Sequence, residues 1–154
     1  MIDLEQLRDY VVKPVLLELD MYSKAAERLV IGTGLVESQM KYIHQISGPA
    51  LGFWQMEPTT HDDIWENYIL FRPDTAKAIA RYTEQDYKNS KQLMWNMRYA
   101  AGMCRLHYRR VPSRLPHEDD IVGMAAYWKE FYNTSLGKGS ETKFIRCAQD
   151  VLAL

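Results

Sequence analysis

The sequence contains very little cysteine, and this shortage argues against two classes of small protein. Cys104 and Cys147 are the only cysteines among 154 residues, and neither lies in a CxxC pattern or in a histidine-rich segment. A disulfide framework needs more cysteines, and the common zinc sites need closer spacing. We therefore expect both side chains to be buried thiols.

The chain also lacks a large net charge of either sign. Its 19 Lys and Arg residues nearly balance its 20 Asp and Glu residues, for a formal net charge of -1. The basic residues are spread along the chain, apart from a group formed by Arg105, Arg109 and Arg110. A protein that gathers a polyanion usually carries a basic patch or stripe. We therefore expect no nucleic-acid partner.

Long apolar runs are missing as well. No stretch approaches the roughly 18 consecutive apolar residues of a membrane-spanning helix. Residues 1–10 carry acidic groups and lack the apolar segment of a signal peptide. We therefore expect neither a membrane span nor a signal peptide, and we expect synthesis in the cytoplasm.

The composition that is present is typical of a globular protein. A hydrophobic fraction of 47% and a charged fraction of 25% argue against disorder, and the length predicts a single domain over residues 1–154. Apolar residues recur at helical spacing while alternation with a period of two is rare, which predicts an all-α fold. The expected helices occupy residues 3–21, 23–38, 60–69, 90–110, 118–132 and 140–152, with a short one after Pro73.

Proline, glycine and capping residues indicate further details of several of these helices. Pro14 is expected to bend the first helix, Ser23 is placed to cap the second, and Thr59 or Thr60 is placed to cap the next. Gly32 and Gly34 each cost about 1 kcal/mol relative to alanine inside a helix, which indicates close backbone contacts there.

The segment from residue 39 to residue 58 has no helical pattern. Gly48, Pro49, Gly52 and Pro58 interrupt any long element, so we expect a loop with a short strand or a turn of helix. Loops on a rigid scaffold often carry function, and this one is the expected binding surface.

Glu37 is the candidate catalytic residue. On a helix that ends near Ser38, it shares a face with Val30, Thr33 and Gly34, which are small or apolar. Burial on such a face raises the pKa of a carboxyl group and suits it to act as a general acid near neutral pH. The alternative is an ordinary surface acid at the end of a helix.

The residues after Glu37 carry a resemblance. Glu37 and Ser38 are followed by a loop that contains Pro49-Ala50-Leu51-Gly52-Phe53-Trp54-Gln55 and then by Pro58-Thr59-Thr60. This pattern resembles the lytic transglycosylases and goose-type lysozymes. Their signature is a Glu-Ser pair that ends a helix, a loop close to Gly-Ala-x-Gly-Leu-Met-Gln, and a Pro-x-Thr. Pro49 and Trp54 depart from it, whereas the separation of Glu37 from Gln55 matches the transglycosylases.

A third motif of that family is Ala-Ala-Tyr-Asn-x-Gly. Ala125, Ala126 and Tyr127 match its start, but Trp128 stands in place of the asparagine, and Tyr132 with Asn133 offers a competing pair. With this motif the resemblance spans residues 23–133. The segment 127–139 also resembles small bacteriophage virion proteins with a lysozyme-like domain.

The resemblance implies a lysozyme-like fold and cleavage of the β-1,4 bond between N-acetylmuramic acid and N-acetylglucosamine in peptidoglycan. Glu37 would protonate the glycosidic oxygen, and Ser38 would hold its carboxyl group. A hydroxyl of Tyr127 or Tyr132 would bond Glu37, and Gln55 would bond the sugar. It implies no metal or organic cofactor.

Other loop residues would complete the sugar site. Gly52 would let the backbone approach a sugar, and Trp54, with Phe53 and Tyr42, would offer apolar faces to the rings. Trp54 could instead belong to the core.

Glu57 corresponds to an acid of the goose-type enzymes that helps to activate water, and its alternative is a loop acid facing solvent. Because a transglycosylase needs only one carboxylate, we expect a 1,6-anhydro product. A hydrolase generally needs two.

Two other interpretations of the sequence are a metal site and a protein without catalytic activity. His61, Asp62 and Asp63 stand together, but acids suit a helix N-terminus and no third ligand is evident, so we expect no metal. The rival to an enzyme is a catalytically inactive virion or adaptor protein that keeps the fold and contacts other phage virion proteins. The enzyme would act on the cell wall, reached through a virion, a membrane hole or an export route.

Overall fold

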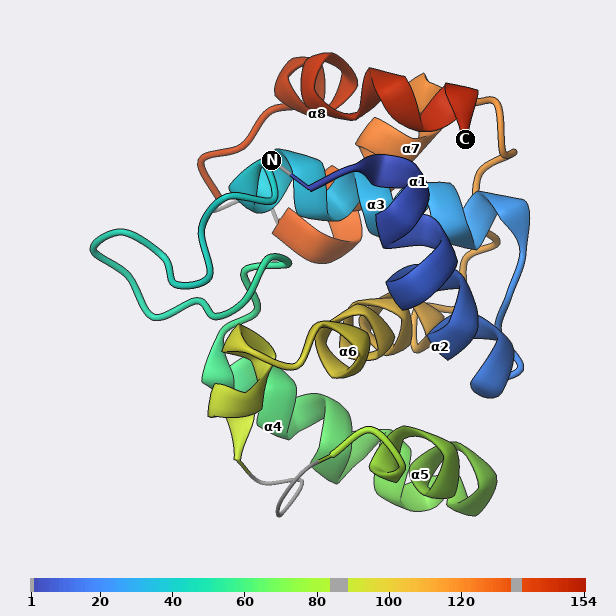
Figure 1. Ribbon diagram of the computed structural model, residues 1–154, viewed down its shortest axis with the longest axis vertical. Coiled ribbons are helices and arrows are strands. Elements are labelled where there is room, and N and C mark those ends of the chain that lie inside the picture. Colours follow the sequence, from blue (N-terminus) through green and yellow to red (C-terminus); the bar gives the residue numbers. More distant parts are fainter. Residues whose placement is uncertain (1, 84–88, 134–136) are drawn as a thin grey trace.

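Helices make up most of the computed structural model, which describes residues 2–83, 89–133 and 137–154 (Figure 1). Within these ranges, β structure is limited to two isolated bridges, His44 with Leu51 and Leu51 with Met56, both in the loop before residue 58. The expected all-α class is therefore confirmed. In the same ranges, no helix is long and apolar enough to span a membrane.

The first helix runs without a break through three segments: α1 (Leu4–Leu7), a π-helical turn η1 (Arg8–Val12) and α2 (Lys13–Glu18). Pro14 has no backbone N–H to donate, and the preceding turn widens so that the N–H of Lys13 reaches the carbonyl of Arg8. The expected irregularity at Pro14 is thus a π-turn. The helix ends at Glu18, earlier than the expected Met21.

Helix α3 (Lys24–Ser38) has the bounds that its sequence predicts, and it is buried over most of its length. The hydroxyl of Ser23 accepts a hydrogen bond from the N–H of Ala26 at 3.0 Å and caps it. The expected close contacts at its glycines are confirmed. A Cβ on Gly32 would lie 3.0 Å from the Phe144 ring, and one on Gly34 would lie 2.6 Å from the sulfur of Met40.

Helices α4 (Pro58–Asn67) and α5 (Pro73–Ala80) both begin at a proline, with a short 3-10 turn, η2 (Ile69–Phe71), between them. Proline suits the first position of a helix because its fixed φ is helical and no N–H is needed there. The expectation that Thr59 or Thr60 caps α4 is therefore wrong, since Glu57 occupies the cap position.

The segment expected to form one helix over residues 90–110 is divided in two. A 3-10 turn, η3 (Ser90–Met94), comes first, and α6 (Met97–Arg109) follows it. The side chain of Asn96 accepts a hydrogen bond from the N–H of Tyr99, which starts a new helix at that point. Within α6, Cys104 is fully buried, whereas Cys147 later in the chain is only partly buried.

Asp120 caps α7 (Ile121–Trp128), which continues as a π-helical turn, η4 (Lys129–Asn133). Ser140 caps α8 (Glu141–Ala148), and a 3-10 turn, η5 (Gln149–Ala153), ends the chain. The buried Arg28 of α3 fastens this end, because its guanidinium group donates to the carbonyls of Leu152 and Leu154.

The arrangement of the helices sets the position of the site. Helices α7 and α8 lie at one end of the molecule, α4 and α5 lie at the other, and α2 and α6 lie between them (Figure 1). The C-terminus of α3 leads into the loop of residues 39–57, which extends to one side. The buried apolar side chains form one cluster from Leu7 to Val151.

Candidate active site

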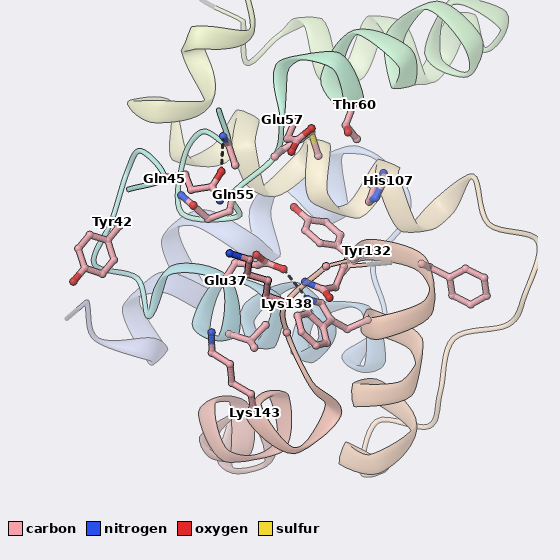
Figure 2. Close-up of a pocket in the computed structure, with 18 of the residues that line it drawn as sticks. Glu37, Tyr42, Gln45, Gln55, Glu57, Thr60, His107, Tyr132, Lys138 and Lys143 are labelled. Carbon is pink, nitrogen blue, oxygen red and sulfur yellow. Dashed lines mark hydrogen bonds between the residues drawn. The ribbon is translucent and has the colours of Figure 1, made fainter. Parts of the chain in front are cut away.

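A pocket of about 1000 Å³ lies where the last turn of α3, the loop of residues 39–57 and the start of α4 meet the C-terminal part of the chain. The C-terminal part contributes the end of α6, the α7–η4 segment and the first turn of α8. Glu37 lies between the two ends of this pocket, with Glu57 and Thr60 toward one end and Lys143 toward the other (Figure 2).

Glu37 has the protonation behaviour of a general acid. Burial raises the pKa of its carboxyl group to about 7, while the hydrogen bond from Trp128 and the positive charge of Lys143 lower it by smaller amounts. The carboxyl group is thus half protonated near pH 7, as the small and apolar face around it predicts.

Trp128 orients this carboxyl group. Its indole Nε1 donates to Glu37 Oε1 at 2.9 Å. Because an indole N–H can only donate, Oε1 must accept, and in the protonated form the proton belongs on Oε2. The Trp128 ring is itself buried and packs against Phe144, with ring centroids 5.5 Å apart, so the donor is firmly held.

In the sequence, Trp128 stands out only as a departure from the Ala-Ala-Tyr-Asn motif. The signal that could have revealed its role is chemical, since a buried indole usually needs a hydrogen-bond acceptor and Glu37 was the candidate buried acid.

The expected contact between Tyr127 and Glu37 is wrong. The hydroxyl of Tyr127 donates to the carbonyl of Ser113 at 3.0 Å, and its ring packs against Tyr108 and Phe131. Consecutive residues on a helix point about 100° apart, so Tyr127 turns away where Trp128 faces Glu37.

Tyr132 reaches the pocket but does not bond Glu37 either. Its ring forms part of the pocket wall, and its hydroxyl donates to the carbonyl of Trp54 at 2.6 Å. This bond connects η4 to the loop of residues 39–57, and both segments line the pocket. The expected tyrosine contact is therefore replaced by the Trp128 indole.

Ser38 holds the loop and not the carboxyl group. Its hydroxyl lies 2.7 Å from the carbonyl of Phe53 and accepts a hydrogen bond from the N–H of Met40 at 3.1 Å. The predicted bond to Glu37 is absent from the contacts of the described residues. Ser38 fixes the loop against the end of α3, which indirectly shapes the pocket.

Gly52 and Trp54 belong to the core, so their expected roles at the sugar are wrong. Gly52 has a φ of 76°, and a Cβ there would lie 2.1 Å from the carbonyl oxygen of Leu93. The close backbone approach is therefore to η3. Trp54 is 1% exposed, and its indole donates to the carbonyl of Val30 at 2.8 Å.

Gln55 lines the pocket, as expected. Its backbone has a φ of 48°, and its side-chain amide donates to the carbonyl of Gly52 at 2.9 Å. Gln45 lies beside it, accepting from the N–H of Ala50, and Tyr42 lies farther out on the same side (Figure 2). Two amide side chains and a tyrosine thus line the loop side of the pocket, together with Ile46, Ser47, Ala50 and Met56.

Glu57 is exposed at the end of the pocket next to Thr60. His107 lies nearby, and burial lowers the pKa of its imidazole to about 4, so the ring is neutral near pH 7. The guanidinium group of Arg110, which also lines the pocket, donates to His107 Nδ1 at 3.1 Å and pairs with Asp63 of α4.

His61 has a structural role. It is fully buried, and its two ring nitrogens contact the Tyr99 hydroxyl at 2.6 Å and the Asp62 carboxylate at 2.9 Å. In the described ranges, no cluster of three His, Cys, Asp or Glu side chains is arranged to hold a metal ion.

Comparison of the chain with protein-family models, with curated proteins and with solved structures finds no match in any of the three.

Proposed function

We propose that this protein cleaves the glycan strands of peptidoglycan, with Glu37 as its general acid and base. The observation that carries the proposal is a carboxyl group with a pKa of about 7 in the wall of a pocket of about 1000 Å³. A general acid works best when its pKa is near the operating pH, because it is then both protonated and able to give up its proton.

The hydrogen bond from Trp128 indicates which oxygen of Glu37 gives up the proton. With Oε1 occupied by the indole, the proton on Glu37 Oε2 passes to the glycosidic oxygen as the bond from that oxygen to the anomeric carbon breaks. The departing sugar leaves with the proton, and Glu37 becomes a carboxylate. The Trp128 indole and the charge of Lys143 both stabilise that carboxylate.

The same carboxylate would complete the reaction. It removes the proton from the substrate's own C6 hydroxyl as that oxygen attacks the anomeric carbon, which gives a 1,6-anhydro sugar and restores the protonated acid. Glu57 is the alternative helper, since it could direct a water molecule to the anomeric carbon and give a reducing sugar. Its exposed position at one end of the pocket favours the one-carboxylate route.

The pocket suits a chain of amide-bearing sugars. Its volume lies at the upper end of the range for ligand sites. Gln45 and Gln55 offer hydrogen-bonding groups on one side, and Tyr132 and Phe131 offer aromatic rings on the other. N-acetylated sugars combine polar groups with apolar ring faces, so they would contact both the amide side chains and the aromatic rings.

A catalytically inactive adaptor is the second candidate. The side chains of Ile43 and Ile46 are 49% and 71% exposed in the loop beside the pocket, which would suit contact with another protein. An adaptor of this kind has no use for an acid with a pKa near 7.

Release of dye from covalently labelled peptidoglycan sacculi separates the two candidates. The wild-type protein should release dye, and Glu37→Gln should lose at least about 100-fold of that rate, because an amide cannot donate the proton. Glu57→Gln is the matched control, which should keep most of the rate on the one-carboxylate route. No release by the wild-type protein would leave the adaptor.

A further inference from the structure

Two lysines line the part of the pocket around Glu37. Lys143 extends from the first turn of α8 toward Glu37, and Lys138 lines the pocket from the turn before α8 (Figure 2). Neither forms an ion pair with any residue that the structure describes, whereas Lys24 and Arg28 are paired with Glu27 and Asp119. Lys143 is also partly buried.

The turn that carries Lys138 is shaped by other contacts. Lys129 donates to the side chain of Asn133 at 2.8 Å and to the carbonyl of Gly137 at 3.0 Å. Gly139 is packed so tightly on the indole of Trp128 that a Cβ would lie 2.4 Å from the ring. The residue that orients Glu37 therefore also sets the position of this turn, with Lys138 between the two glycines.

The position of these lysines relative to Glu37 indicates what they meet. Lys143 is close enough for its charge to act on the Glu37 carboxyl group. In its proton-donating form Glu37 is neutral and cannot balance the charge of the partly buried Lys143, while Lys138 next to it is exposed. A bound molecule with a negative group next to the scissile bond would supply that charge. Lysine ammonium groups pair readily with carboxylates, most strongly where water is partly excluded.

We propose that Lys138 and Lys143 form a subsite for a carboxylate carried by the sugar next to the scissile bond, so that the substrate class is an anionic glycan. This inference rests on the proposed function. N-acetylmuramic acid bears a lactyl group that ends in a carboxylate, or in a peptide that itself carries carboxylates. Oligomers of N-acetylglucosamine have the same amide-bearing rings without that charge.

Binding to the Glu37→Gln variant tests the subsite without turnover. Isothermal titration at low salt compares N-acetylglucosaminyl-N-acetylmuramic acid with di-N-acetylchitobiose, which lacks the lactyl carboxylate. The muramyl disaccharide should bind about tenfold more tightly, which is the ratio that one charge-assisted hydrogen bond supports. A third ligand, the same disaccharide with its stem peptide, shows whether the lactyl group or the peptide supplies the carboxylate.

Matched variants assign the preference to the lysines. Adding Lys143→Gln to Glu37→Gln should remove the preference, Lys143→Arg should keep most of it, and Lys77→Gln on the distant α5 should leave it unchanged. Equal affinity for the charged and uncharged ligands, or no binding of any of them, would overturn the subsite. So would a preference that survives both Lys143→Gln and Lys138→Gln.

The outcomes separate this proposal from the proposed function. A lysine-dependent preference together with sacculi that stay intact would retain the subsite and reject the cleavage. Cleaved sacculi together with a preference that ignores both lysines would retain the cleavage and reject the subsite.

Discussion

Replacing Glu37 by glutamine should make the protein more stable at neutral pH and leave its stability unchanged at acid pH. Burial raises the pKa of the carboxyl group from 4.5 to about 7, so the folded state binds a proton that the unfolded state releases. The stability that this bound proton gives to the folded state is fully present below about pH 4.5 and is lost as the pH rises through about 7. An amide never ionises, and the Trp128 indole can still donate to its oxygen.

The size of the effect follows from the two pKa values. At roughly 1.4 kcal/mol for each pH unit between them, the buried charge costs the wild-type protein about 3 kcal/mol by pH 8. Glu37→Gln should recover most of this. In a chain of this length that gain corresponds to a rise in melting temperature of about 6 to 12 °C at pH 8.

Urea unfolding followed by circular dichroism at pH values between 4.5 and 8 measures the difference. The free energy of unfolding of Glu37→Gln should exceed that of the wild-type protein by an amount that grows from near zero to about 3 kcal/mol across this range. Glu57→Gln is the control, because Glu57 is exposed and its replacement should change stability by no more than about 0.5 kcal/mol. A difference that does not vary with pH would refute the argument that Glu37 is desolvated.

Three further predictions concern the site and the loop that shapes it. The protonated form of Glu37 is the active acid, so kcat/KM on peptidoglycan should fall as the pH rises above about 7, and a flat profile between pH 6 and 9 would exclude Glu37 as the acid. Trp128→Phe removes the hydrogen bond that lowers the pKa of Glu37. The fall in kcat/KM on the alkaline side of the pH profile should therefore move to higher pH, while the maximal rate decreases. If kcat/KM fell at the same pH in this variant as in the wild-type protein, the indole would not act on the carboxyl group. Gly52→Ala places a Cβ against the carbonyl of Leu93 at a positive φ, so it should lower the free energy of unfolding by at least about 2 kcal/mol. A urea midpoint equal to that of the wild-type protein would contradict this packing.

Much of the helical framework could be predicted because its signals are local. Ser23 before an apolar periodic segment predicts α3, and its hydroxyl caps that helix. Pro73 predicts the start of α5, and Ser140 predicts the start of α8. Asn96 was missed because the apolar pattern continues on both sides of it, and only its side-chain hydrogen bond to the following turn divides the helix.

The candidate site was predictable only in part. Glu37 was a candidate because its helix face is small and apolar over two turns, and the motif of Glu37, Ser38 and Gln55 made it the expected catalytic residue. The direction of Tyr127 depends on which face of α7 packs against α3 and α8, and that choice is made by tertiary contacts. Gly52 and Trp54 meet Leu93 and Val30, which are distant in sequence, so a loop motif alone could not show that both are core residues.

Mass spectrometry of the material released from purified peptidoglycan tests the central claim most directly. The wild-type protein should release muropeptides that end in a 1,6-anhydro sugar, lighter than the hydrolysed product by one water, and Glu37→Gln should release none above the level of untreated sacculi. A predominantly reducing product that disappears with Glu57→Gln would establish a hydrolase with two working carboxylates. Identical profiles for the wild-type protein, Glu37→Gln and untreated sacculi would contradict the account.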